Sequence, residues 1–497
     1  MAARHASALK KLAGQTLVYG LSTVFARLIN YALVPLHSRA FDNQADYGVV
    51  SEIYAWVTFL NVIFLYGMET AFFRHAGMRK EGEESSMSAV FGSGFWSLVL
   101  TSTLGAGLLM VGSGGIADAL SLAGQGSTYV ICFAGIIALD AIVAIPFARL
   151  RLAERPFVYL AIKLLNVGVN VGLNYWWLLP MAQGESPRPI PFGLDPVGAV
   201  FLANLAASAI TLLVFLPMIA GWKPGFDRQM WGKMMRYGAP FILTGLAGMV
   251  NEVMDRILLG RLMAGTIEEN RAEVGIYSAA YKLSIFMTLA VQAFRMGAEP
   301  FFFRMAGERD AREVYATIMR YFVVVGCGIA LAVSVALPWL RHILGTQYQS
   351  GLGIVPVLLF ANLFLGLFYN LAIWYKLTDK TRNGAWLAVF GAAITLIGNF
   401  ALIPLIGYWG SAWTTLASYG LMALASAMWG RQHYPVPYAW GRILTWIGLT
   451  GAMIYAICQP WISGAEVPEW SALSLVLMSV WLGAALWLEG RPLLRGR

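Results

Sequence analysis

The stretch FVVVGCGIALAVSVALPW, residues 322–339, contains no charged side chain. A helix rises about 1.5 Å per residue, so a run of about twenty apolar residues can cross a hydrocarbon core of about 30 Å. A similar run surrounds residues 394–405. In lipid, only helices and closed barrels satisfy every backbone group, and barrel strands show alternating segments of roughly ten residues. These continuous runs therefore predict transmembrane helices.

The whole chain shares this apolar character. Its 497 residues are 58% hydrophobic and 12% charged, with a mean hydropathy of +0.64, whereas soluble domains carry about 25% charged residues. We therefore predict an all-α, polytopic integral membrane protein with about fourteen spans. Their expected ranges are 13–37, 48–73, 87–111, 126–149, 158–180, 196–221, 236–261, 274–303, 316–339, 353–376, 384–405, 410–430, 442–460 and 471–489.

Basic residues between these spans predict the orientation. They are concentrated in every second segment, beginning with Arg4, Lys10 and Lys11, whereas the alternate segments hold only Arg39, Arg188, Arg261, Arg271 and Arg341. Lysine and arginine are enriched in cytoplasmic loops of membrane proteins. The N-terminus is therefore predicted to be cytoplasmic.

The net charge of +9 is accounted for by these loops. The basic residues form no single block interleaved with aromatic residues, so we expect no nucleic-acid partner. Cys132, Cys327 and Cys458 each fall inside an apolar run, which argues against a disulfide framework or a zinc site. The sequence contains no Walker-type phosphate-binding motif, and we expect no cofactor or metal.

Two parts of the chain resemble each other. Residues 47–54 read YGVVSEIY and residues 274–281 read VGIYSAAY, which places a Gly-x-x-Ser-x-x-Tyr pattern at the start of the second and eighth spans. Internal duplication is common in transporters. We predict an N-lobe at 1–221 (spans 1–6), a cytoplasmic basic linker at 222–235, a C-lobe at 236–430 (spans 7–12) and two C-terminal spans within 431–497. Chance similarity between apolar segments is the alternative.

The N-terminal third carries a family resemblance. The run LAGQTLVYG at residues 12–20, LVPL at 33–36, YG at 47–48 and YGMETAFFR at 66–74 resemble the start of bacterial polysaccharide biosynthesis flippases, and the GIYS block at 275–278 is similarly typical. The chain thus resembles the polysaccharide-transporter (Wzx-type) branch of the multidrug/oligosaccharidyl-lipid/polysaccharide exporter (MOP) superfamily. The number and spacing of spans and the lobe duplication extend this resemblance over nearly the whole chain.

The resemblance implies a function and a location. Members enclose a cavity between two lobes, open it alternately to each side of the bacterial cytoplasmic membrane, and flip polyprenyl-pyrophosphate-linked oligosaccharide for O-antigen, lipopolysaccharide and other surface polysaccharides. The implied partners are this lipid-linked substrate, membrane lipids, and H⁺ or Na⁺ as a coupling ion. A monomer is expected, with polysaccharide assembly proteins as candidate associates.

Charged residues inside the spans are candidates for the transport site, because each costs about 2.5–3.5 kcal/mol to insert. Arg27 lies roughly 21 Å from the inner face and Lys282 roughly 12 Å from the outer face, by helical rise. Arg256 lies toward the outer end of the seventh span. In the resembling family these spans face one another, and a pyrophosphate needs cations. We therefore predict Arg27, Arg256 and Lys282 as headgroup contacts.

Carboxylates complete the predicted site. Glu52 and Asp255 are expected to support the three cations or to bind a coupling ion. Asp140, near the middle of the fourth span, is the best single candidate for a titrating carboxylate. An interhelical hydrogen bond is an equally good explanation for it.

Structural explanations compete for several of these charges. Glu252 with Arg256, and Arg295 with Glu299, are four residues apart and can neutralise each other on one helix. Glu69 and Lys163 lie near the inner face and are expected to reach the interface there.

Three alternative functions compete with this one. A cation-coupled multidrug or toxin exporter of the same superfamily would favour an acidic cavity, and a lipid II flippase would use the same fold. A membrane enzyme, such as a polysaccharide polymerase or ligase, would need a large outer loop or a mid-membrane histidine, and the sequence shows neither. We predict that the chain is not an enzyme.

Overall fold

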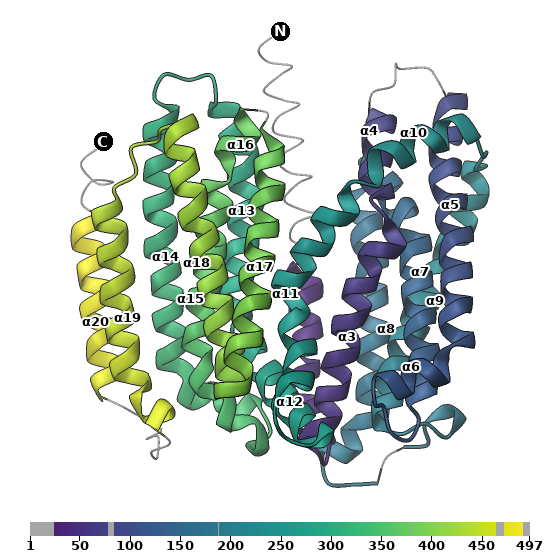
Figure 1. Ribbon diagram of the computed structural model, residues 1–497, viewed down its shortest axis with the longest axis horizontal. Coiled ribbons are helices and arrows are strands. Elements are labelled where there is room, and N and C mark those ends of the chain that lie inside the picture. Colours follow the sequence, from purple (N-terminus) through teal and green to yellow (C-terminus); the bar gives the residue numbers. More distant parts are fainter. Residues whose placement is uncertain (1–23, 78–83, 187, 379, 464–471, 491–497) are drawn as a thin grey trace. The chain divides into compact units, whose positions relative to one another are not determined.

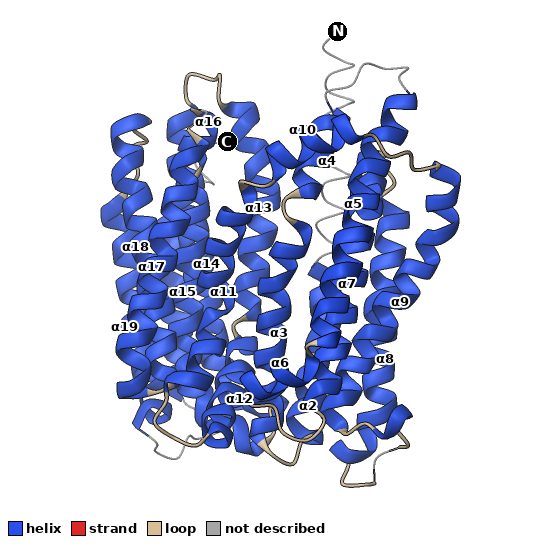
Figure 2. Ribbon diagram, turned by 45° about the vertical axis from the view of Figure 1, so that its right-hand side comes forward, coloured by secondary structure: helices blue, strands red, loops and turns tan. Residues whose placement is uncertain are grey.

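The computed structural model describes residues 24–77, 84–186, 188–378, 380–463 and 472–490. Within these ranges the chain forms helices joined by short loops, and no strand occurs (Figure 2). The all-helical, polytopic membrane fold is therefore confirmed. The helices group into two compact units, Met1–Arg261 with Gly265–Val274 (unit 1), and Leu262–Ala264 with Gly275–Arg497 (unit 2).

Unit 1 begins, within the described residues, with the helical stretch 24–31. Its further helices are α2 (Leu33–Ala40), α3 (Gln44–Leu65), α4 (Met68–Gly77), α5 (Glu84–Val111), α6 (Ser113–Ala119), α7 (Gly126–Leu152), α8 (Pro156–Ala182), the 3₁₀ turn η1 (Pro191–Gly193), α9 (Pro196–Trp222), α10 (Arg228–Gly238) and α11 (Phe241–Leu262). The long helices α3, α5, α7, α8 and α9 run beside one another within this unit (Figure 1).

Helix α12 (Ile267–Leu283) begins in unit 1 and ends in unit 2. Unit 2 continues with α13 (Ile285–Met305), α14 (Ala311–Leu340), the short turns η2 (Arg341–Ile343) and η3 (Thr346–Ile354), α15 (Val355–Leu371), α16 (Ile373–Leu377), α17 (Thr381–Ile406), α18 (Tyr408–His433), α19 (Trp440–Ser463), α20 (Ala472–Ala485) and the π-turn η4 (Leu486–Gly490). The last two helices, α19 and α20, pack on α14 (Figure 1).

Every predicted span overlaps with helix in the described residues. Ten helices there are long and apolar enough to cross a membrane, and the pair α12 and α13, bent by 50°, would make an eleventh. Helices α11 and α18 are not among these ten. Several charged residues in α11, and many Gly, Ser and Thr residues in α18, lower the hydropathy of these two helices below that of the others. The predicted first span begins at residue 13, so its start, like Arg4, Lys10 and Lys11, lies outside the described residues.

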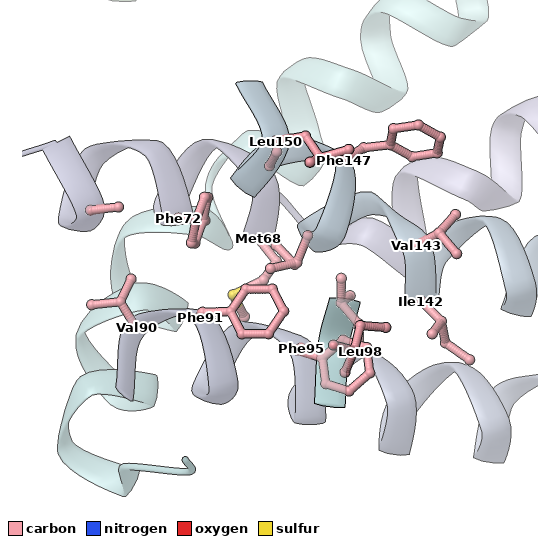
Figure 3. Close-up of a cluster of buried hydrophobic side chains, with 14 of the residues drawn as sticks. Met68, Phe72, Val90, Phe91, Phe95, Leu98, Ile142, Val143, Phe147 and Leu150 are labelled. Carbon is pink, nitrogen blue, oxygen red and sulfur yellow. The ribbon is translucent and has the colours of Figure 1, made fainter. Parts of the chain in front are cut away.

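The core of unit 1 is a cluster of buried aromatic and aliphatic side chains on α4, α5, α7 and their neighbours. Phe72, Phe91, Leu98 and Leu150 are fully buried within it (Figure 3). Burial of each such side chain contributes about 1.5–3 kcal/mol when water is the reference solvent. Between membrane helices the gain comes instead from close packing, and this cluster lies at the end of the unit that holds the basic loops.

Helix α10 closes this end of unit 1. The Asp227 side chain accepts hydrogen bonds from the backbone N–H groups of Gln229 and Met230, which caps the start of the helix. Its apolar face packs on the cluster, and the Trp231 indole N–H donates to the Ser97 hydroxyl at 2.7 Å. Arg228, Lys233 and Arg236 occupy its exposed face. Most of the range predicted as a basic linker, residues 222–235, thus lies in the amphipathic helix α10 (Arg228–Gly238).

Sharp backbone turns bring two helix junctions together beside α10. Gly67, between α3 and α4, has φ +73°, and a Cβ atom at this position would lie 2.2 Å from the backbone oxygen of Gly238. Only glycine allows both the positive φ and this approach.

The predicted boundary between the lobes, at residue 236, stays a prediction. Helix α11, which follows this boundary, groups with unit 1 by its contacts.

Candidate functional site

Glu52 lies in a buried ion-pair cluster of unit 1. Its side chain is 3% exposed, one carboxylate oxygen lies 3.3 Å from Nε of Arg271, and the other lies 3.5 Å from Nη2 of Arg261. Arg271 also donates to the backbone oxygens of Leu120 and Ser121 at 2.7 and 2.9 Å. Both arginines therefore neutralise Glu52 and hold the chain just after α6.

Helix packing fixes this cluster. Gly48, one turn before Glu52 on α3, faces the backbone of Arg271 so closely that a Cβ atom would lie 1.9 Å from the Arg271 oxygen. Arg261 Nη1 donates to the backbone oxygen of Ala119 at 3.2 Å, at the end of α6. Carbonyl groups at a helix C-terminus attract cations. Both arginines were predicted only as loop residues, and the structure makes them partners of a span carboxylate.

Arg256 and Asp255 lie on α11 in unit 1. Arg256 Nη1 is 3.0 Å from Asp255 Oδ1, and the two side chains are 14% and 5% exposed. The same Nη1 atom donates to the backbone oxygen of Glu252 at 2.7 Å. Arg256 therefore binds the backbone carbonyl group of Glu252 and pairs with the carboxylate of Asp255. The spacing of four residues had indicated the Glu252 side chain instead.

Asp140 occupies a polar cluster between membrane helices. Ser208 on α9 donates to Asp140 Oδ1 at 2.7 Å, so the interhelical hydrogen bond considered from the sequence is present. Lys163 on α8 interacts electrostatically with Asp140, and its ammonium lies 4.4 Å from the ring centre of Phe147. Arg151 and Glu69 also act electrostatically on Lys163, so the expectation that Lys163 reaches the inner interface stays a prediction.

A second polar pair lies on the helices that flank Asp140. Asn204 on α9, one turn before Ser208, donates to the Tyr54 hydroxyl on α3 at 3.0 Å. Helices α3, α7, α8 and α9 thus place one acid, one base and several neutral hydrogen-bonding groups inside unit 1. Burying a charge is tolerable only with such partners. The arrangement can hold a proton or release it.

The remaining predicted site residues lie in different parts of the chain. Arg27 is exposed on the helical stretch 24–31 of unit 1. Lys282 is partly exposed in the last turn of α12 and belongs to unit 2. Convergence of Arg27, Arg256 and Lys282 on one headgroup stays a prediction.

Two other carboxylates have partners that sequence spacing did not indicate. Glu69 on α4 pairs with Arg151 on α7, whose guanidinium also lies over the Phe73 ring at 4.9 Å. Glu299 lies 3.7 Å from Arg295, as its spacing of four predicted, but it binds Lys376 more closely, at 2.5 Å. Glu69 pairs with a residue of another helix, and the shorter of the two Glu299 contacts also comes from another helix. No local pattern in the sequence could have found either partner.

Comparison with known proteins gives one family match. Residues 191–306 match the family described as polysaccharide biosynthesis protein. This segment runs from η1 to the end of α13 and contains Arg256 and Lys282. Comparison with curated protein sequences gives no match.

Solved structures share the fold over most of the chain. The lipid II flippase MurJ, in an inward closed conformation, is 12% identical over 95% of this chain and 99% of its own, with a TM-score of 0.66. An inward-facing multidrug resistance MATE family transporter of the MOP superfamily is 15% identical over 88% of this chain and 99% of its own, with a TM-score of 0.59.

A third solved structure is a MOP superfamily transporter from Pyrococcus furiosus, which is described as having a binding pocket of reverse polarity. It is 13% identical over 84% of this chain and 95% of its own, with a TM-score of 0.58. The family match over residues 191–306 agrees with the resemblance to the polysaccharide-transporter branch, and the solved structures show that the chain has the fold of these transporters.

Proposed function

We propose that this protein is a flippase that moves polyprenyl-pyrophosphate-linked oligosaccharide across the bacterial cytoplasmic membrane by alternating access. The observation that carries the proposal is the match to polysaccharide biosynthesis proteins in a chain with the fold of a lipid II flippase. Translocation breaks no covalent bond, so the protein needs no catalytic groups for it. It needs cations because the pyrophosphate headgroup is anionic, and it needs a path for the lipid tail. The product would enter surface polysaccharides such as O-antigen.

Arg27, Arg256 and Lys282 are the proposed headgroup contacts. Arg256 supports this assignment because its largely buried guanidinium carries several N–H donors in a fixed planar arrangement. Guanidinium groups bind phosphate oxygens in pairs. Asp255 would hold the Arg256 side chain in place between transport cycles.

Asp140 is the proposed coupling carboxylate, for H⁺ or Na⁺. Ser208 and Lys163 give it a hydrogen bond and a nearby cation, so a change in its protonation would change the contacts between α7, α8 and α9. The sequence also offered Glu52, either as a support for the cations or as a group that binds the coupling ion. Its two arginine partners favour a structural role instead.

Export of lipid-linked glycan from cells or proteoliposomes tests the site. Arg27→Ala, Arg256→Ala and Lys282→Ala should each abolish export while protein levels stay normal. Arg309→Ala, which removes an exposed cation between α13 and α14, is the matched control and should export normally. Normal export from all three site variants would refute the headgroup assignment.

A coupling role predicts a different phenotype. Asp140→Asn should leave headgroup binding intact and remove the dependence of export on the ion gradient. Ser208→Ala should shift that dependence without removing it. If Asp140→Asn exports with an unchanged gradient dependence, Asp140 is not the coupling group.

Multidrug export is the second candidate, because MATE transporters share the fold. Cells that carry the protein would then gain resistance to cationic drugs. The flippase proposal expects no such gain, together with restored surface glycan in a strain that lacks its own flippase. The opposite pair of results would favour the drug exporter.

A further inference from the structure

A cavity in unit 2, lined in part by the Glu299, Arg295 and Lys376 side chains described above, combines charge with an unsatisfied buried amide. It opens between α13, α15 and α16, which pack on one another. Its space of about 290 Å³ includes a mouth that is open to solvent, and only a small part of it is enclosed. Its polar lining comes from Arg295, Glu299, Tyr369, Asn370 and Lys376, and Phe294 forms part of its apolar wall.

Asn370 is the unusual residue of this cavity. It is 1% exposed, and neither its Nδ2 nor its Oδ1 atom has a hydrogen-bond partner in the described part of the chain. Buried polar side chains are nearly always hydrogen-bonded in native proteins, so each exception needs a reason. An amide that lines a cavity and offers both a donor and an acceptor is suited to a polar ligand.

The charges beside Asn370 do not cancel. Lys376 Nζ lies 2.5 Å from one oxygen of Glu299, whereas Arg295 Nε lies 3.7 Å from the other oxygen, beyond hydrogen-bond distance. The Arg295 guanidinium covers the Tyr369 ring at 4.6 Å, and its side chain remains 50% exposed. Among the described residues that line the cavity, two cations face one carboxylate, so one positive charge is left for an anion.

The geometry points to a phosphosugar. We propose that the Arg295 guanidinium binds phosphate oxygens, and that the Asn370 amide pairs with a hydroxyl or acetamido group of the attached sugar. Guanidinium groups suit phosphate because their N–H donors match its oxygens in pairs. The aromatic wall from Phe294 and Tyr369 offers an apolar surface to the sugar ring. The inference rests on the proposed function and adds to it a second binding site, which would hold the phosphate-linked sugar at a different step from the contacts proposed for Arg27, Arg256 and Lys282.

Direct binding to the purified full chain tests this site. The chain is placed in phosphatidylcholine nanodiscs and titrated by calorimetry with N-acetylglucosamine 1-phosphate, with N-acetylglucosamine and with inorganic phosphate. The phosphosugar should bind at least tenfold more tightly than either fragment. Equal affinity for phosphosugar and phosphate would overturn the proposal, because Asn370 would then contribute nothing.

Two variants separate the two contacts. Arg295→Gln should weaken phosphosugar binding at least tenfold, so that the phosphosugar binds no more tightly than the free sugar. Asn370→Leu should make the phosphosugar bind no more tightly than inorganic phosphate. A melting temperature close to that of the wild type would show that the Asn370→Leu variant is folded. Arg309→Gln, an exposed cation at the end of the adjoining loop, is the control and should bind normally. Unchanged binding in both site variants would refute the assignment.

The source of the phosphate is tested by changing the lipid. In nanodiscs that contain phosphatidylglycerol, the affinity for the phosphosugar should stay the same. A loss of affinity there would mean that lipid phosphate occupies the cavity, which would overturn the sugar assignment. If the Arg295→Gln variant still exports glycan, the phosphosugar site is refuted but the flippase proposal is not. If the wild-type protein binds the phosphosugar but exports no glycan, the flippase proposal is refuted.

Discussion

The Glu52 cluster in unit 1 and the Glu299 site in unit 2 have the same composition, one carboxylate and two cations, but different surroundings. Glu52 faces two arginines that also bind backbone carbonyls of residues 119–121, and Arg271 is 7% exposed. Glu299 is 34% exposed, and Arg295 beside it is 50% exposed next to an unsatisfied amide. The first arrangement clamps helices together, and the second is open to a ligand.

Removal of each carboxylate charge should give the largest difference between the two sites. Glu52→Gln leaves Arg271 buried without its counter-ion, and breaking a buried pair in this way costs about 3–5 kcal/mol. Glu299→Gln should cost less than about 1 kcal/mol, because its partners are solvated. Apparent melting temperatures in one detergent measure both. A larger loss for Glu299→Gln would reverse the comparison.

Close backbone packing at the Glu52 cluster should have the next largest effect. Gly48→Ala places a methyl group 1.9 Å from the Arg271 oxygen, so α3 must move away from the start of α12. Such overpacking costs about 1–3 kcal/mol. Gly107→Ala on α5, where no atom lies within 4 Å of the new Cβ, is the control and should melt like wild type. Equal stability of the two variants would show that the cluster is loosely packed.

Two buried asparagines should show the smallest but most specific difference. Asn174 accepts a hydrogen bond from His37 at 2.8 Å, in one tautomer of that ring, and donates to the Asn170 carbonyl, so Asn174→Leu should cost about 1–3 kcal/mol. Asn370→Leu removes an amide without partners, so it should be neutral or stabilising in ligand-free protein. Thermal melting checks both. A strong loss for Asn370→Leu would assign that amide to folding rather than to binding.

The helices were predictable because each span is a local pattern. A run as long and as apolar as residues 322–339 is not expected in a soluble protein. Helix α14 (Ala311–Leu340) contains the whole of this run. The break at Ser284, where α12 meets α13, was not predictable in the same way. Neither proline nor glycine occurs there, and the bend joins two apolar segments that read as one span.

The candidate site was predictable only in part. The sequence identified Glu52 and Asp140 because charges within apolar runs need a reason. It could not name Arg271 as the partner of Glu52, since the two residues are 219 positions apart. Nor could it single out Asn370, which looks like any polar residue in a membrane helix until its surroundings are known.

The sequence by itself determined that this chain is a multi-pass helical membrane protein, because hydrophobic length and the need to satisfy the backbone in lipid are properties of each segment. Only the tertiary structure decided which charges are closed into ion pairs and which remain open. Pairing depends on the neighbour that each helix meets. The Lys376 contact that draws Glu299 away from Arg295 comes from a helix 77 positions away.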